Sequence, residues 1–192
     1  MVHFLAATLA ILAILQLGLV AAADGPGLKR TKGYYWVRAV TAPNFHKYLQ
    51  SSPLYSPGPA ILGNRTAAGQ FNIDSSGQLY QLVVRTDSKD SKEKIPQDIP
   101  KDNRHLFLTV SSEKTHGGKT LATSLSETPN KFGKFAFQGD TLTWSGPEKR
   151  PQENAWLVCA GQRLFINLSG FKSPTSECAE QTIHYFNGEH VD

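Results

Sequence analysis

The sequence predicts one compact all-β domain of short antiparallel strands. Three observations predict this fold. Runs rich in aromatic and β-branched residues alternate with turn residues, as strands and turns do. No stretch after residue 23 shows a helical period. A hairpin pattern also recurs in FNIDSSGQLY, FAFQGDTLTW and WLVCAGQRLFI. Each of these stretches has apolar residues on both sides of a glycine-containing turn, which lets a hairpin bury one face.

The first half of the domain begins with GYYWVRAV (33–40), a strand by composition. Residues 41–69 are rich in proline and small polar residues, so we expect a long ordered loop with short extended pieces. Residues 70–85 predict a hairpin that turns at 75–77. Residues 86–104 are dense in balanced charge, which predicts an exposed loop; the functional alternative is a partner-binding loop.

The second half continues the same pattern. HLFLTVSS and GGKTLATSLSE each predict a strand, and CAEQTIHYFNG predicts the last one. Two hairpins lie between them, with turns at Gly139–Asp140 and at 160–162. Three hairpins favour a β-trefoil-like domain. The turn glycines Gly77, Gly139 and Gly161 are unevenly spaced, however, so a β-sandwich stays the alternative.

The N-terminus predicts export. Residues 1–23 form an apolar run that ends in small residues, and Ala21 and Ala23 fit an A-x-A cleavage site. The alternative is a transmembrane anchor, but the small-residue end favours cleavage after Ala23. Residues 24–32 form a basic tail. Within this tail, Lys29–Arg30 is a dibasic pair that a processing protease would cut after Arg30, or else simply a solvated basic segment. The domain then spans 33–192.

Cysteines and sequons agree with export. The two cysteines, Cys159 and Cys178, are expected to pair in an oxidising compartment. Sequons occur at Asn64, in a polar stretch, and at Asn167, in an apparent strand; both are predicted N-glycosylation sites.

The sequence shows no motif for catalysis, cofactor binding or metal binding. The formal charge of +4 is spread along the chain, which predicts no nucleic-acid groove. The histidines and cysteines lack metal-ligand spacing, so we expect no metal site. A glycosidase would need two acids brought together, but Asp74 and Asp140 each occupy a predicted turn, where aspartate is favoured for backbone reasons. We therefore expect no enzymatic activity and no cofactor.

Aromatic residues supply the one candidate ligand surface. Trp144 and Trp156 fall in the hairpin pattern, which favours the core. Strand alternation must turn part of the run Tyr34–Tyr35–Trp36 outward, so these three residues are the predicted ligand-facing surface.

The hairpins and cysteines carry a family resemblance. FNIDSSGQLY, FAFQGDTLTW and AWLVCAGQRLFINLSG, followed by ECA, resemble the phialide cell-wall proteins of filamentous fungi, the PhiA-like family of small secreted wall proteins and elicitors. The likeness covers about residues 70 to 186. LFINLSGFKSPTSECAEQTIHY is also similar to the C-terminal region of yeast wall proteins with internal repeats.

The resemblance implies a secreted, cell-wall-associated fungal glycoprotein without enzymatic activity, linked to conidial development. Its expected partner is a wall polysaccharide. The alternative is a secreted effector or elicitor that binds a host protein or host polysaccharide. After signal cleavage we expect no membrane association.

Overall fold

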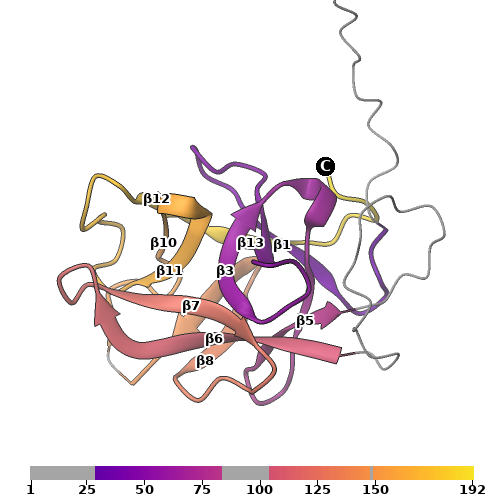
Figure 1. Ribbon diagram of the computed structural model, residues 1–192, viewed down its shortest axis with the longest axis horizontal. Helices are drawn as coiled ribbons and strands as arrows, with labels where there is room; N and C mark the ends of the chain where they lie inside the picture. The colour runs from indigo at the N-terminus through magenta and orange to yellow at the C-terminus, as the bar shows by residue number, and fades with distance from the viewer. Residues whose placement is uncertain (1–28, 84–103, 148) are drawn as a thin grey trace, which may run out of the picture.

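A computed structural model of the protein describes residues 29–83, 104–147 and 149–192 (Figure 1). These residues fold into β-strands with two short 3-10 turns, and every strand pair is antiparallel, so the all-β prediction is confirmed. Within the described ranges no helix has the length and apolar character needed to cross a membrane. The predicted leader 1–23 and nearly all of the charged loop 86–104 lie outside these ranges.

The strands follow one another in close succession. The first are β1 Tyr35–Ala39, β2 Tyr48–Ser51, β3 Gly58–Gly63, β4 Gln70–Ile73, β5 Leu79–Val83, β6 Arg104–Thr115 and β7 Thr120–Ser126. The others are β8 Lys134–Gln138, β9 Thr141–Ser145, β10 Trp156–Cys159, β11 Arg163–Asn167, β12 Ala179–Gln181 and β13 Ile183–Phe186. The 3-10 turns are η1 Arg65–Ala67 and η2 Ala160–Gln162.

Eight strands close into an antiparallel barrel. The path runs β1–β2–β3–β11–β7–β6–β5–β4 and returns to β1. Closure leaves these strands without a free edge, which removes the usual template for aggregation. In Figure 1 the long β6–β7 hairpin runs along the lower side of the molecule.

Three hairpins meet pairwise within this arrangement. They are β2–β3, β6–β7 and β10–β11, and they join through the pairs β3–β7, β7–β11 and β11–β3. Two further hairpins, β4–β5 and β8–β9, lie on either side of β1 and β13, because β1 pairs with β4 and β13 while β13 pairs with β9. The Phe135 N–H donates to the Gly77 carbonyl at 2.9 Å and links these two hairpins.

The tryptophans lie in the core. Trp144 and Trp156 are 1% and 0% exposed, so their predicted core role is confirmed. Their indole N–H groups donate to the carbonyls of Phe132 and Leu142, each at 3.0 Å. These bonds satisfy the one polar atom of each ring and allow the large apolar surface to be buried.

Asp74 acts as a turn residue, as predicted. Its Oδ1 accepts the N–H of Ser76 at 2.9 Å, the Ser76 hydroxyl at 2.7 Å and the N–H of Gln78 at 3.0 Å. These bonds, with Ser76 first, hold the pKa of Asp74 below its usual value. Gly77 then takes a φ of +82°, which a side chain rarely adopts.

The segment 41–69 differs from its prediction, because it contains the β2–β3 hairpin as well as loops. All four residues of β2 are buried, so its sequence YLQS shows no alternation of polar and apolar positions. The predicted last strand is likewise divided in two, β12 and β13. β12 pairs with β10 and β13 pairs with β1, so the break between β12 and β13 lets this segment pair with two different strands.

Candidate functional site

The predicted ligand-facing residues divide into two groups. Tyr34 and Tyr35 are half-buried, with part of each ring open to solvent. Trp36 is 0% exposed, and its indole N–H donates to the Gly188 carbonyl at 3.2 Å. The prediction that Trp36 faces a ligand is therefore wrong. The alternation of β1 directs its ring into a small core cluster with Tyr48 instead.

Tyr34 belongs to a cluster of four rings, which we call the aromatic patch: Tyr34, Tyr80, His105 and Phe107. The Tyr34 and Tyr80 rings meet edge to face at 6.1 Å, and Tyr80 lies 4.6 Å from His105 and 6.3 Å from Phe107. The Tyr34 hydroxyl and the His105 Nε2 are 3.2 Å apart. Since β5 and β6 are paired, with Tyr80 opposite Phe107, alternation places these side chains on one face of the sheet.

The chemistry of the patch is amphipathic. Its ring faces are apolar, whereas the tyrosine hydroxyl and the imidazole supply hydrogen-bonding groups at the edges. Burial, reinforced by Tyr80, raises the pKa of Tyr34. Tyr34 therefore keeps its phenol proton at neutral pH and remains a hydrogen-bond donor.

A cleft lies beside the patch, farther along β6, and is lined by other residues. Alternation puts His105, Phe107 and Thr109 on the same face of this strand. Ser126 lies opposite Phe107 and Ser124 lies opposite Thr109 across the β6–β7 pair. The cleft is shallow and open, with a volume of about 540 Å³. Its lining includes Lys131, Phe132 and five hydroxyl-bearing side chains. The hydroxyl-bearing residues are Thr109, Ser112, Ser124, Ser126 and Thr128.

The floor of the cleft is held rigidly by Asn130, which is 6% exposed. Its Oδ1 accepts the Val110 N–H at 3.0 Å, and its Nδ2 donates to the carbonyls of Phe132 and Gly133 at 2.9 and 3.0 Å. The Asn130 N–H donates to Gln78 Oε1 at 2.7 Å. These bonds tie β6 to the segment that leads into β8, so the cleft is preformed.

Tyr35 occupies a separate aromatic group, with Phe137 and Tyr185. The ring centroids are 6.0 Å apart for Tyr35–Phe137, 4.8 Å for Tyr35–Tyr185 and 5.0 Å for Phe137–Tyr185. Phe137 also packs against the main core. This group therefore combines packing with partial exposure, and Tyr35 contributes less open ring surface to a ligand than an unstacked tyrosine would.

Asp140 makes contacts that its turn position did not predict. Its Oδ2 lies 3.0 Å from His184 Nδ1, and the Thr141 hydroxyl lies 3.2 Å from His184 Nε2. Carboxylate, imidazole and hydroxyl follow one another in the order of a hydrolase triad. However, the Thr141 hydroxyl also donates to Asp140 at 3.4 Å, so the three groups form a closed network at the end of paired strands. We assign this network a structural role.

A second polar network surrounds Asp192. Its carboxylate accepts hydrogen bonds from Arg38 and from the Tyr48 hydroxyl, the latter at 2.6 Å, and lies 3.6 Å from His46 Nδ1. Burial opposes ionisation of Asp192, but the bonds from Arg38 and Tyr48 outweigh it and lower the pKa of Asp192. The Phe186 ring covers the Arg38 guanidinium at 3.9 Å.

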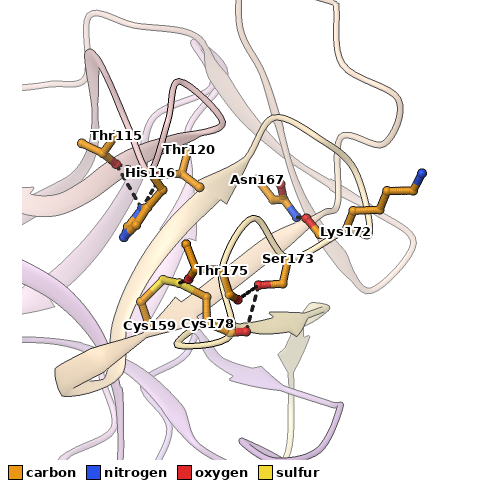
Figure 2. Close-up of a disulfide and its surroundings, with 9 residues drawn as sticks. All are labelled: Thr115, His116, Thr120, Cys159, Asn167, Lys172, Ser173, Thr175 and Cys178. Atoms are coloured by element: carbon orange, nitrogen blue, oxygen red, sulfur yellow. Dashed lines mark hydrogen bonds between the residues drawn. A yellow bond between two sulfur atoms is a disulfide. The ribbon is translucent and has the colours of Figure 1, made fainter.

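The disulfide prediction is confirmed, whereas the two sequons differ. Cys159 and Cys178 are bonded. Asn64 is exposed and open to a glycan. Asn167 is 0% exposed, and its Nδ2 donates to the carbonyls of Gly170 and Lys172, the second at 3.0 Å (Figure 2). A glycan would be bonded to this same nitrogen, so the folded chain has no room for one at Asn167, and that prediction is corrected.

The predicted processing pair is held against the other end of the chain. Arg30 donates from its side chain to the carbonyls of Gly188 at 3.2 Å and Tyr34 at 3.0 Å. Lys29 pairs with Glu189 at 3.1 Å. Cleavage after Arg30 stays a prediction, and it would require this segment to detach first. The predicted cleavage at Ala23 lies outside the described residues.

Comparisons with protein-family models, with curated proteins and with solved structures found no match for this chain. The resemblance to phialide wall proteins therefore stays a hypothesis.

Proposed function

We propose that this protein is a secreted, cell-wall-associated fungal glycoprotein that binds a wall polysaccharide without transforming it. The observation that carries the proposal is that the aromatic patch and the hydroxyl-lined cleft are neighbours along β6, where Phe107 of the patch lies opposite Ser126 of the cleft. The disulfide and the exposed sequon at Asn64 support an extracellular location. The link to conidial development comes from the resemblance alone.

This surface suits a sugar chain for two reasons. The C–H faces of pyranose rings are apolar and stack on aromatic rings, as Tyr80 and Phe107 would allow. Sugar hydroxyls need donors and acceptors at close spacing, and serine and threonine hydroxyls provide both. A surface that extends over several paired strands would contact several sugar units, so the ligand is expected to be a polymer.

We also propose that the domain is β-trefoil-like. Support comes from the three hairpins that pair with one another, β2–β3, β6–β7 and β10–β11. In this arrangement the turns at Gly77 and Gly139 are equivalent to each other, whereas Gly161 is equivalent to the β6–β7 turn at Gly117. The uneven spacing of the three predicted turn glycines follows, because they belong to two different sets of turns.

The test is a pull-down of the purified protein with insoluble β-glucan and with chitin, measured as the fraction bound. Tyr80→Ala with Phe107→Ala removes the centre of the aromatic patch and is expected to reduce binding at least tenfold. Phe45→Ala with Phe171→Ala removes two exposed rings outside the patch, 59% and 41% exposed, and serves as the matched control. If both double variants bind like the parent, or the parent does not bind, the surface has been misassigned.

The alternative function is binding to a host protein as an effector. The same two rings, Phe45 and Phe171, would be its contact residues, because they are the exposed large hydrophobic side chains among the described residues. An effector would lose its target when Phe45 and Phe171 are removed and keep it when Tyr80 and Phe107 are removed. The two double variants therefore separate the two functions.

A further inference from the structure

The disulfide has a histidine beside it that the sequence does not indicate. His116 lies in the turn between β6 and β7, above Cys159 and Cys178 (Figure 2). One potential ligand atom from each of these residues lies within 4.8 Å of the other two. The His116 ring also meets Phe165 edge to face at 5.1 Å, which fixes its position over β11.

The orientation of the imidazole is set by threonine. His116 Nδ1 lies 2.8 Å from the Thr120 hydroxyl and 3.4 Å from the Thr115 hydroxyl. Nδ1 is therefore engaged, and Nε2 remains as the ring nitrogen available to a metal. Histidines that bind metals characteristically hydrogen-bond through their second nitrogen, which fixes the tautomer and the ring direction.

We propose that Cys159, Cys178 and His116 form a metal site that opens when the disulfide is reduced. The oxidised pair has no thiolate and cannot bind the ion. The reduced pair supplies two thiolates, and His116 Nε2 is the third ligand. Two sulfurs and one imidazole nitrogen select a zinc-like, thiophilic cation over calcium or magnesium, which require oxygen ligands.

The chemistry balances in two steps. A dithiol reductant transfers two electrons and two protons to the Cys159–Cys178 bond, which breaks to give two thiols while the reductant becomes a disulfide. The divalent cation then displaces the two thiol protons and forms two metal–sulfur bonds. The neutral imidazole of His116 coordinates the cation through the lone pair of Nε2 and releases no further proton.

The required spacing is within reach of the fold. Zinc–sulfur bonds of about 2.3 Å in a tetrahedral site separate the two sulfurs by about 3.8 Å, close to the contact distance of two unbonded thiols. Cys159 ends β10, and Cys178 precedes β12 on the neighbouring strand, with Cα atoms 4.0 Å apart. The paired strands therefore keep both thiols together after reduction.

Both cysteines line a cleft of about 290 Å³, together with Gln162 and Glu177, and His116 lies outside this lining. Each cysteine is 8% exposed, so a small reductant and a metal ion can approach from this side. Three protein ligands with one position left for water is the arrangement of an accessible zinc site, as opposed to a closed structural one.

The test uses the purified chain, Co²⁺ as a spectroscopic substitute for Zn²⁺, and a phosphine reductant. We expect the reduced protein to bind one Co²⁺ per chain with thiolate charge-transfer absorption, and the oxidised protein to show none. His116→Ala removes a direct ligand and should weaken Co²⁺ binding by more than the roughly 10- to 100-fold that loss of an outer-shell partner costs. His190→Ala changes an exposed histidine outside the cluster and should leave Co²⁺ affinity unchanged.

Near-UV circular dichroism of the tryptophans reports whether the reduced chain stays folded. If reduction unfolds it, the cation must restore the folded signal, because binding to the folded state stabilises that state. A reduced chain that binds no Co²⁺, folded or unfolded, overturns the proposal. Equal Co²⁺ affinities of His116→Ala and His190→Ala would also overturn it, since they would remove His116 from the site.

Discussion

Replacing Arg150 with methionine should destabilise the fold strongly. The guanidinium donates to the carbonyls of Trp144 at 2.8 Å, Ala155 at 2.9 Å and Asn167 at 3.1 Å, and also to that of Glu153. Burial lowers the pKa of Arg150 to about 10, so the group is still charged at neutral pH. One side chain therefore joins the end of β9, the end of β11 and the loop between β9 and β10.

The expected loss in the free energy of unfolding depends on which carbonyls lose their only hydrogen-bond donor. Glu153 keeps the Trp144 N–H at 3.0 Å, and Ala155 keeps the Asn167 N–H at 3.1 Å. The carbonyl of a strand residue points the same way as its N–H, so those of Trp144 and Asn167 face Arg150. Two orphaned carbonyls at roughly 1–3 kcal/mol each, less about 1 kcal/mol for the apolar area that methionine buries beyond the arginine stem, predict a loss of about 3 kcal/mol.

Urea unfolding followed by tryptophan fluorescence measures this loss. With a denaturant slope of about 2 kcal/mol/M, the midpoint should fall by about 1.5 M. Lys149→Met removes the same charge from the exposed neighbouring position and is the control. If the free energies of unfolding of Arg150→Met and Lys149→Met differ by less than about 0.5 kcal/mol, the two carbonyls do not depend on Arg150 as described.

Three further predictions concern modification, pH and the disulfide. Mass spectrometry of the secreted protein should find a glycan at Asn64 and none at Asn167; a glycan at Asn167 would contradict the buried amide. Asp192→Asn should destabilise the protein at pH 7. The difference in unfolding free energy between the two proteins should vanish as the pH falls below the usual aspartate range. The reason is that the carboxylate stabilises the fold above its unfolded pKa, and this stabilisation is lost as the pH falls through the lowered pKa of the folded state. Urea melts of both proteins from pH 7 to pH 2 test this, and a difference that does not depend on pH would contradict it. Replacing Cys159 and Cys178 with alanine should cost about 3 kcal/mol in the same assay, since the bond closes a loop between residues 19 apart; an unchanged midpoint would show that the bond does not constrain the unfolded chain.

Local patterns predicted most of the strands, but they missed the β2–β3 hairpin and the division of the last strand into β12 and β13. The three predicted hairpins are present because each combines apolar strand residues with a turn that its own residues specify, such as Asp74 and Gly77. The β2–β3 hairpin was missed because YLQS is buried at every position, and a strand covered on both faces has no alternation to detect. Detecting β2 from the sequence would have required knowing which strands pack around it.

The candidate sites divide in the same way. The partial exposure of Tyr34 could be predicted, because an aromatic run in extended chain must expose part of itself, whereas its contact with a ligand stays a prediction. Tyr80, His105 and Phe107 could not be joined to it, because Tyr80 lies on β5 and the other two on β6, and the sequence does not show which strands pair. His116 lies more than 40 positions from Cys159, outside any ligand spacing that a motif search would examine.

By itself the sequence determined most of the strands, the three predicted hairpin turns and the disulfide pairing, because each depends on short-range backbone preferences or on having two cysteines and no others. Only the tertiary structure decided which residues meet. It buried Trp36 and Asn167, assembled the aromatic patch, and brought His116 to the cysteines. These outcomes depend on strand register and barrel closure, which are set by contacts between residues far apart in the chain.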